Sequence, residues 1–410
     1  MINSKESVGI DDLNVYAGRS RVAFADIADA RKAPAEVLEN AGFDHRGILP
    51  DFEDPVTLAV NAARPVLRDM DDESIGLLLV STETGIDFGK PISTYISSAL
   101  SLPEYCRNME VKHACYGGTG ALGLASAWVA TQPDPNAKAL VVTSDIARCH
   151  LNDSVEYSGG LGACAMVVSR DPRLVTLFPS NAVATQEVYD VARPTPTTEY
   201  SDAVLSLSAF LDLLEQSWLR YRETICDRDL CEQFKHVVYH VPIVSLVEKA
   251  HQTLLELDSF EVTHAEITAS FKSQVSPSLK FSREIANAYS GGVYVALAGL
   301  LSDERVTPND AIGFFSYGSG ACSEFFSGQV TGDAAARMRR HQISEKLAER
   351  RLVNFGEYEL ALLQHEKQML AKDYCPDLTQ LGGLYSDAYE GRQLLVLDEI
   401  VNHHRRYRWT

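Results

Sequence analysis

The sequence predicts an α/β protein whose strands and helices alternate in packed layers. Short runs rich in valine, isoleucine and leucine recur along the chain. Their hydrophobicity is continuous rather than alternating, which is typical of strands covered on both faces. Stretches of helical length and pattern lie between these runs, and such interleaving indicates a layered α/β fold. A weak internal repeat further suggests two similar halves.

Six segments carry the strand pattern, and three carry the helix pattern. The expected strands are IGLLLVST (75–82), ALVVTSD (139–145), ACAMVVS (163–169), HVVYHVP (236–242), AIGFFSYG (311–318) and LLVLDEI (394–400). The expected helices span 119–131, 206–225 and 344–370. TQPDPNAK (131–138) predicts a turn between a helix and a strand, because its proline, aspartate and asparagine residues favour turns.

The internal repeat pairs two glycine-rich turns that each open an apolar helix. ACYGGTGALGLA (114–125) is similar to AYSGGVYVALAG (288–299), and each is followed by a segment containing Gly-Ala-Cys. In the second copy Ala288, beside Asn287, stands where the first has Cys115. The pattern favours one active site between two pseudo-symmetric halves, although chance similarity between two glycine-rich turns would give the same pattern.

Composition excludes several classes of function. With 410 residues, 45% of them hydrophobic and 23% charged, the chain has the composition of a globular enzyme with a large core. Its net charge of −19 argues against nucleic-acid binding, which relies on Lys and Arg to neutralise phosphates. A loose basic cluster near the start is the exception, and its members are Arg19, Arg21, Arg31 and Lys32.

Cysteine spacing and hydropathy predict neither a metal site nor a membrane segment. The eight cysteines are spread singly, without the paired spacing of a structural zinc site. The first residues contain no apolar core of a secretory signal. The longest apolar run, at 291–301, is too short to cross a bilayer. We therefore expect a cytoplasmic protein with reduced cysteines.

The segment HACYGGTGAL (113–122) contains a candidate nucleophile. Cys115 lies just before two glycines and the start of a helix. The positive end of a helix lowers the pKa of a thiol, and the thiolate is the reactive form. Gly117 and Gly118 would let backbone and substrate approach closely. Taken alone, the motif leaves catalysis and a tight strand-to-helix turn equally open.

Three further segments, in order along the chain, make the pattern specific. VSTETGID (80–87) places Glu83 after a strand, VVYHVP (237–242) places His240 at the end of another, and FFSYGSG (314–320) runs from a strand into glycines. Together with the cysteine motif, these segments resemble the 3-hydroxy-3-methylglutaryl-CoA synthase family of the thiolase superfamily. The resemblance extends over nearly the whole chain, from GIDDLNVY (9–16) to HHRRYRW (403–409).

The resemblance implies both a fold and a reaction. The fold would be the thiolase-like five-layered αβαβα arrangement of two pseudo-repeated halves. The half at 1–172 would carry Glu83 and Cys115, and the half at 173–410 would carry His240, Asn287 and Ser319. The reaction would move an acetyl group onto a cysteine, deprotonate its methyl group and add the enolate to the ketone of a β-ketoacyl thioester. Hydrolysis would then release the product.

Residue roles follow from the same resemblance. Cys115 matches the family nucleophile, and Glu83 matches the general acid/base, whose pKa burial would raise toward neutrality. His240 matches the histidine that binds the acceptor and polarises its carbonyl. The backbone amides of Cys115 and Ser319 are candidates for an oxyanion hole. Four further residues match weaker family positions: Asn287 near the carbonyls, Lys249 near pantetheine or its phosphates, and the ordering carboxylates Asp145 and Asp190. His113 is expected to pack beside the nucleophile.

The resemblance leaves two pathways and a non-catalytic alternative. In primary metabolism both substrates are coenzyme A thioesters, whereas a polyketide β-branching branch uses acyl carrier proteins. IANAYSGG (285–292), VEYSGGLGA (155–163) and the terminal YRW favour the polyketide branch. The expected partners are then an acetyl-carrier-protein donor and a β-ketoacyl-carrier-protein acceptor, in a homodimer that needs no cofactor. A scaffold that only docks carrier proteins would not require the set of Cys115, Glu83 and His240.

Overall fold

The computed structural model describes residues 7–68, 70, 74–148 and 154–410. Within these ranges, no helix is both long and apolar enough to span a bilayer. The strands are β1 (Val8–Tyr16), β2 (Ser20–Ala23), β3 (His45–Ile48), β4 (Ile75–Ser81), β5 (Arg107–Val111), β6 (Lys138–Ile146), β7 (Leu161–Arg170), β8 (Val175–Thr185), β9 (Val191–Thr195), β10 (Thr198–Ser201), β11 (His236–Tyr239), β12 (Ala311–Gly318), β13 (Cys322–Val330), β14 (Arg351–Leu352), β15 (Leu395–Val401) and β16 (His404–Trp409). The helices are α1 (Phe24–Arg31), α2 (Ala35–Ala41), α3 (Pro55–Leu67), α4 (Ile92–Ala99), α5 (Gly117–Thr131), α6 (Ala203–Thr224), α7 (Leu230–Gln233), α8 (Val244–Asp258), α9 (His264–Ser270), α10 (Ser282–Ile285), α11 (Gly292–Leu301), α12 (Ala334–His341), α13 (Ile343–Ala348), α14 (Phe355–Leu370) and α15 (Gln380–Ala388).

The large sheet contains the same strand pattern twice. Its order is β11-β12-β13-β8-β1-β7-β6-β4-β5. In one half β4 is parallel to β6, and β6, β7 and β1 follow antiparallel. In the other half β11 is parallel to β12, and β12, β13 and β8 follow antiparallel. This repeated order supports the two predicted halves, and their exact boundary at residue 172 stays a prediction.

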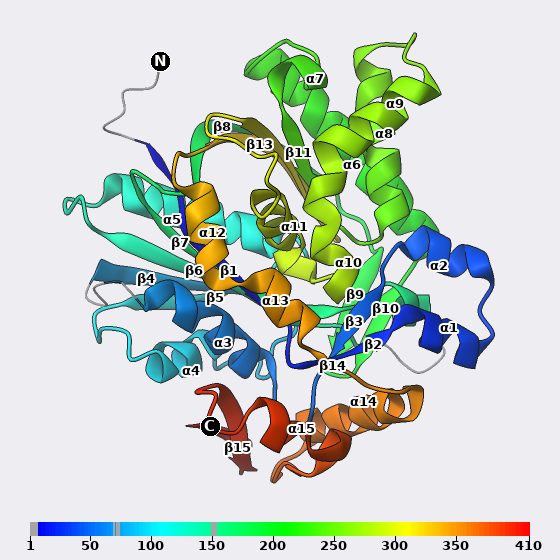
Figure 1. Cartoon of the computed structure of the whole chain (residues 1–410). Helices are drawn as coiled ribbons and strands as arrows, with labels where there is room; N and C mark the ends of the chain where they lie inside the picture. The colour runs from blue at the N-terminus through cyan, green and yellow to red at the C-terminus, as the bar shows by residue number, and fades with distance from the viewer. Residues whose placement is uncertain (1–6, 69, 71–73, 149–153) are drawn as a thin grey trace.

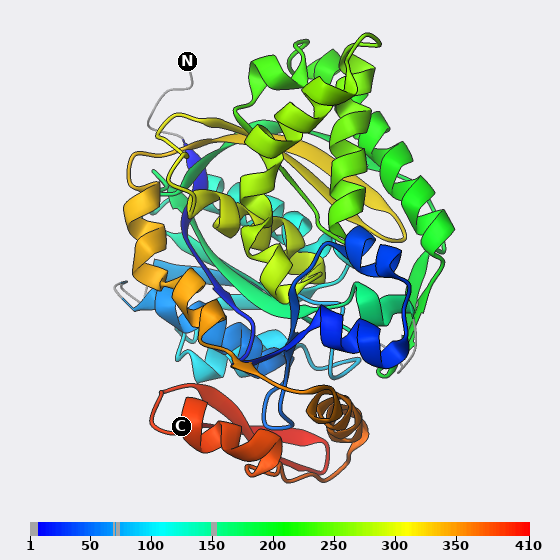
Figure 2. The same ribbon diagram turned by 45° about the vertical axis from the view of Figure 1, so that its right-hand side comes forward.

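The helices form three layers around the two halves of the sheet, as Figures 1 and 2 show. On the outside, α3 packs against β1, β6 and β7, and α6 packs against β8 and β13. Between the halves, α5 packs on β4 and β6, and α11 packs on β11 and β12. Every residue of α11 is buried, which explains why its sequence has no polar face. The predicted αβαβα layering is confirmed.

Few strand residues pair across the seam between the halves, but side chains of the two halves also contact each other there. Three residues of β1, Val8 to Ile10, pair with Val175 to Leu177 of β8 and make the sheet continuous. Below this seam, the Thr119 hydroxyl on α5 lies 2.8 Å from the hydroxyls of both Tyr294 and Ser316. A helix of the first half is therefore hydrogen-bonded to a helix and a strand of the second.

The prediction of one helix over 344–370 is wrong. The chain forms α13, then the short strand β14, which pairs with β2, and then α14. Asn354 starts α14, because its side chain accepts from the Glu357 N–H, and the Glu357 carboxylate accepts from the Asn354 N–H at 2.9 Å. This capping box is visible in the sequence as N-x-x-E and marks a new helix start.

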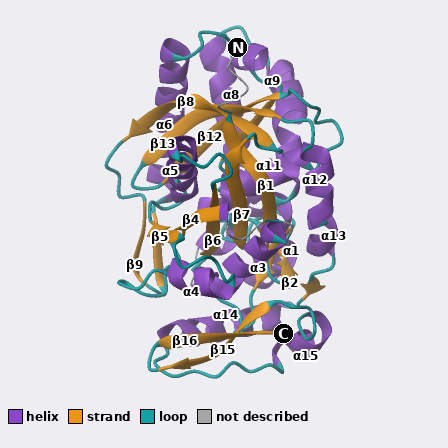
Figure 3. Ribbon diagram, turned by 90° about the vertical axis from the view of Figure 1, so that its left-hand side faces the viewer, coloured by secondary structure: helices purple, strands orange, loops and turns teal. Residues whose placement is uncertain are grey.

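The segment at 394–400 is a strand but does not belong to the large sheet. As β15 it pairs with β16 and makes one isolated bridge, between Ile400 and Tyr374, and this hairpin packs with α14 and α15 below the main body, as Figure 3 shows. These elements share a second, smaller core with Val22, Ile48 and Phe52. The run is apolar because its first residues are buried, with Leu395 in the main core and Val396 in the smaller one, whereas Asp398 and Val401 further along are exposed.

Candidate active site

Cys115 lies in the turn that leads directly into α5. Gly117, the first residue of α5, has no room for a side chain, since a Cβ atom would lie 2.4 Å from the Ser81 hydroxyl. At Gly118 a Cβ atom would lie 2.3 Å from the carbonyl oxygen of Ser290 in the other half. The close approach at Gly117 is thus to a side chain of the first half and that at Gly118 is to backbone of the second, and together they hold the cysteine turn against both halves.

The side chain of Glu83 reaches the candidate nucleophile. The Cys115 Sγ atom lies 3.4 Å from Glu83 Oε1 and donates to it. Burial raises the pKa of Glu83 to about 8, against the opposing effect of Arg193 and with help from the carboxylates Asp145 and Glu199. Burial and the nearby Glu83 charge also raise the pKa of the Cys115 thiol well above its usual range. In the resting site, both groups therefore hold their protons at neutral pH.

Asp145 fixes the backbone that carries Glu83. One of its carboxylate oxygens accepts from the Glu83 N–H at 2.8 Å and from the hydroxyls of Thr82 and Thr84, each at 3.1 Å. The other oxygen accepts from the Ser290 N–H at 3.1 Å and from the Ser290 hydroxyl. Asp145 is fully buried and joins the Glu83 loop to the turn before α11. These contacts support the ordering role that the family resemblance implies for Asp145, and that role stays a prediction.

Arg193 is a charged group of this site that the sequence analysis missed. Its guanidinium lies 3.6 Å from Glu83 Oε2 and 2.8 Å from Glu199 Oε2, and it lies over the ring of Tyr289 at 4.9 Å. It is the cation that opposes the effect of burial on Glu83. The segment around it, DVARPT (190–195), contains no motif that points to catalysis. Its proline indicates only an edge strand.

His240 follows β11 and lies almost wholly out of contact with solvent. Its backbone N–H donates to the Phe315 carbonyl at 2.8 Å, while the Nδ1 atom of its ring has no hydrogen-bond partner among the described residues. Burial lowers the pKa of His240 to about 3, so the imidazole is neutral. A Cβ atom at Gly292 would lie 2.6 Å from Nδ1, so this glycine makes room for the ring.

Cys115, Glu83 and His240 line one cavity of about 110 Å³. A larger cavity of about 830 Å³ adjoins it and shares Glu83, Ala114, Val191 and Ser319 with it. Glu83 therefore lies between the two spaces. The other residues of the smaller cavity come from both halves: Val155, Ser158, Glu199, Ser201, Ser206, Phe210, Pro242, Leu246, Asn287, Tyr289 and Tyr317.

Asp190 holds the turn that carries Ser319. Its carboxylate accepts from the Tyr317 hydroxyl at 3.0 Å and from the Gly320 N–H at 3.1 Å, on either side of Ser319 in the chain. Ser319 lines both cavities, and Cys115 lines the smaller one with it. Asp190 is buried, and its two hydrogen bonds fix both ends of the turn that contains Ser319.

The remaining predicted residues differ in position. Asn287 lines the smaller cavity, and its side-chain oxygen accepts from the Tyr289 N–H at 2.8 Å. Lys249 is exposed on α8 and does not line either cavity. His113 lines the larger cavity and packs edge-on against the Tyr116 ring, with 5.5 Å between ring centres. Its expected packing role is thus consistent with its position.

The basic cluster predicted near the start of the chain is largely paired. Lys32 is exposed, but the three arginines form ion pairs with acidic residues from distant segments. Reversing their charges would break these pairs, so they are poor probes of partner binding. The pairs are Arg19–Glu349 at 3.6 Å, Arg21–Glu284 at 2.7 Å, Arg31–Glu156 at 3.0 Å and Arg31–Glu359 at 2.8 Å.

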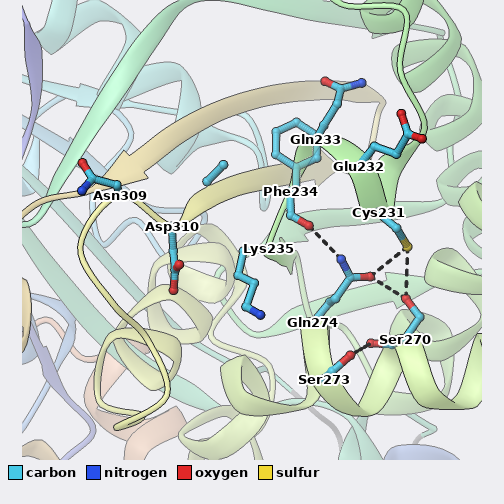
Figure 4. A pocket seen from close by; sticks show the side chains of 11 residues that line it. Cys231, Glu232, Gln233, Phe234, Lys235, Ser270, Ser273, Gln274, Asn309 and Asp310 are labelled. Atoms are coloured by element: carbon cyan, nitrogen blue, oxygen red, sulfur yellow. Dashed lines mark hydrogen bonds between the residues drawn. The ribbon is translucent and has the colours of Figure 1, made fainter.

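A separate cavity of about 570 Å³ lies at the opposite end of β11 from His240 (Figure 4). Cys231 donates there to the side-chain oxygen of Gln274 at 3.2 Å. The Ser270 hydroxyl donates to the same oxygen, and His251 Nε2 lies 2.8 Å from the Ser270 hydroxyl oxygen. Because Ser270 directs its proton to Gln274 rather than to His251, the cluster lacks a nucleophile paired with a base.

The cysteines and acidic groups elsewhere offer no metal centre. Cys149 lies outside the described residues, and the seven other cysteines are free thiols. No group of three or more His, Cys, Asp or Glu side chains in the described ranges could hold a metal ion.

A cysteine at the start of α5, in contact with a glutamate and between two thiolase-like halves, defines an acyltransferase of the thiolase fold. Residues 4–172 match the family description "Hydroxymethylglutaryl-coenzyme A synthase N terminal", and residues 258–408 match the corresponding C-terminal description. The chain belongs to the hydroxymethylglutaryl-CoA synthase family.

Similar proteins extend over the full length of the chain. The polyketide biosynthesis 3-hydroxy-3-methylglutaryl-ACP synthase PksG of Bacillus subtilis (strain 168) is 34% identical, over 98% of this chain and 99% of its own. The hydroxymethylglutaryl-CoA synthase of Enterococcus faecalis is 32% identical, over 86% and 91%. The crystal structure of the curacin biosynthetic pathway HMG synthase in complex with holo donor-ACP has a TM-score of 0.95 and 34% identity, over 98% and 100%.

Proposed function

We propose that this HMG synthase acts in polyketide β-branching, on substrates carried by acyl carrier proteins. An acetyl group on Cys115 would condense with the ketone of a β-ketoacyl thioester. The observation that carries the chemistry is the 3.4 Å contact between Cys115 Sγ and Glu83 Oε1 in a cavity that His240 also lines. The carrier-protein substrates are supported by the full-length similarity to PksG and to the curacin synthase in its complex with donor-ACP.

Acetyl transfer is the first step of the proposed mechanism. The Glu83 carboxylate accepts the thiol proton of Cys115, and the sulfur attacks the carbonyl of the acetyl thioester. Backbone amides of Cys115 and Ser319 would stabilise the oxyanion that forms. The new thioester bond forms as the bond to the pantetheine sulfur breaks, and that sulfur takes the proton from Glu83. Glu83 is then again a carboxylate, ready for the next step.

Condensation is the second step. Glu83 removes a methyl proton from the acetyl group, the enolate carbon attacks the acceptor ketone, and Glu83 returns the proton to the ketone oxygen as the new carbon–carbon bond forms. The His240 imidazole can donate a hydrogen bond to an acceptor carbonyl. Because its lowered pKa keeps the ring neutral, it does so without adding a positive charge to the site. Asn287 would orient the same carbonyls. Water then hydrolyses the enzyme thioester and frees Cys115. Lys249, exposed on α8, would contact the arm only outside the cavity.

The mouth of the smaller cavity has an exposed apolar surface that suits a carrier protein. Ser201 and Ser206 line the cavity, and Val204 between them is 80% exposed at the start of α6. Leu205 and Leu207 on the same turns are also exposed. A protein that inserts its pantetheine arm past these serines would cover this surface, whereas free coenzyme A would leave it bare.

We therefore expect the double variant Val204→Glu/Leu205→Glu to lose acetylation by an acetyl-carrier protein. The two carboxylates would meet an acidic partner on a surface that needs apolar contact, so the rate should fall by about tenfold or more. Acetylation by acetyl-pantetheine should change less than about twofold. Mass spectrometry of the intact protein measures both, since an acetyl group adds about 42 Da to the enzyme.

Leu219→Glu is the matched control, because Leu219 is exposed on the same helix but does not line the cavity. It should be acetylated by the carrier protein at the wild-type rate. Efficient condensation of acetyl-CoA with acetoacetyl-CoA, with no acetylation by any carrier protein, would instead assign the enzyme to primary metabolism. No adduct with any donor would favour the scaffold.

We further propose a homodimer formed through the edge of the large sheet. β5 ends the strand order and has no described neighbour on its outer side, and Met109 on it is 44% exposed. A second copy pairing there would cover this open edge. Analytical ultracentrifugation should show a dimer, and Met109→Pro, which removes a strand N–H, should shift it to monomer. A wild-type monomer at micromolar concentration would contradict the proposal.

A further inference from the structure

A fourth cavity, of about 420 Å³, lies apart from the candidate active site. It forms where the end of β1, helix α3, helix α13 and the turn before β15 meet. In Figure 1, α3 lies on the side of the main body that faces the C-terminal hairpin. The cavity shares no lining residue with either space around Glu83. Its chemistry is therefore independent of the acyl transfer.

Basic side chains dominate its lining, although the chain as a whole carries a net charge of −19. Its acidic members are only Glu345 and Glu349. The basic residues come from four separate segments, so the fold rather than the local sequence brings them together. They are Arg19, Arg64, Arg68, Lys346 and Arg392.

Most of these cations lack an acidic partner. Arg64 is held by the Gln393 carbonyl at 2.6 Å and by the Trp409 ring, and so has a structural role. Arg19 meets only Glu349, at 3.6 Å, and the side chain of Glu349 is 64% exposed. Of the ion pairs formed by described residues, none involves Arg68, Lys346 or Arg392.

The crowding of these charges has a measurable cost for the lysine. Burial lowers the pKa of Lys346, the neighbouring charges of Arg68 and Arg19 lower it further, and the charges of Glu349 and Glu345 oppose this shift only in part. Cations gathered in a concave site repel one another, and an anion bound among them would remove that repulsion. A bidentate guanidinium geometry at Arg19 and Arg68 matches phosphate oxygens particularly well.

We propose that this cavity binds a phosphate-bearing anion, with a diphosphate group held by Arg19, Arg68, Lys346 and Arg392. The volume suits a small molecule and is too confined for a helix of a partner protein. The anion would connect β1 and α3 of the main body with the turn that precedes the C-terminal hairpin. Its source is either inorganic pyrophosphate or the diphosphate of a nucleotide.

Calorimetric titration of the full-length wild-type protein tests the site, with pyrophosphate, ADP and adenosine as probes. The titration is made at about 150 mM salt, where the Debye length is about 8 Å. We expect saturable binding of one pyrophosphate or ADP per chain, and none of adenosine. Tighter binding of ADP than of pyrophosphate would identify a nucleotide as the source, and equal binding would identify the diphosphate alone.

The double variant Arg68→Gln/Lys346→Gln should weaken binding by about tenfold or more, because each lost charge removes a direct contact. Without the anion, the variant should melt no lower than the wild type, since it relieves repulsion. The control Lys272→Gln/Lys367→Gln makes the same change of net charge at two exposed lysines elsewhere. Wild-type affinity in the cavity variant, an equal loss in the control, or no saturation at millimolar probe would each overturn the proposal.

Discussion

Cys115→Ser is expected to fold normally and to form no acetyl-enzyme. A serine hydroxyl has a far higher pKa than a thiol, and Glu83, whose own pKa is about 8, is too weak a base to remove its proton. Turnover should fall by about a thousandfold or more, as it does when a covalent nucleophile is removed from other acyl-transfer enzymes. Intact-protein mass spectrometry after incubation with the acetyl donor measures the adduct directly.

The matched control is Cys231→Ser, which removes an exposed thiol in the distant cavity at the start of β11. That variant should acquire one acetyl group at the wild-type rate. A fully active Cys115→Ser enzyme, with the acetyl group found on another cysteine, would show that the nucleophile has been misassigned.

Glu83→Gln is expected to separate the two chemical steps. Condensation needs a base for the methyl proton, and its loss should slow this step by about a hundredfold to ten-thousandfold, the usual contribution of a general base. Acetyl transfer should be slowed less, because the oxyanion amides remain and because the variant removes the Glu83 charge that helps to raise the pKa of the Cys115 thiol. The acetyl-enzyme should therefore accumulate, and mass spectrometry should detect it while product formation stays low. Near wild-type product formation would place the base elsewhere.

The pH dependence of condensation provides an independent test of Glu83. Burial raises the pKa of this group to about 8, so the reactive carboxylate is the minor form at pH 7 and grows as the pH rises. The single-turnover rate should rise through about pH 8 in the wild type, and this rise should be absent in Glu83→Gln. Glu53→Gln is the control, because Glu53 is a buried glutamate with a pKa raised to about 7 that lines neither catalytic cavity.

The layered fold and the grouping of the main site residues could be predicted from short motifs. Buried strands such as 75–82 and 139–145 are continuous apolar runs, and both appear as β4 and β6. Cys115, Glu83 and His240 follow strand ends or precede a helix, where side chains converge at one edge of a sheet. Motif order thus located a cavity whose walls come from segments more than a hundred residues apart.

What the sequence concealed depends on long-range pairing of charges. β1 crosses the centre of the sheet, yet its two consecutive aspartates, Asp11 and Asp12, are typical of a surface segment. Both carboxylates are buried and find partners far along the chain, including Arg173 and His341. Arg193 was missed for the same reason, because its role depends on Glu83, which lies far away in the sequence and beside it only in the fold. No local periodicity records such partners.

The contact between Gly118 and the Ser290 carbonyl restricts how the two repeats can diverge. A single added methyl group on one side would push against the backbone on the other, and Asp145, which also holds Ser290, would lose its grip on the Glu83 loop. Recombination between relatives is therefore tolerated least at this junction. Chimeras that inherit both inner helices from the same parent should keep the catalytic turn in place, whereas those that exchange one alone would combine surfaces that have not been selected together.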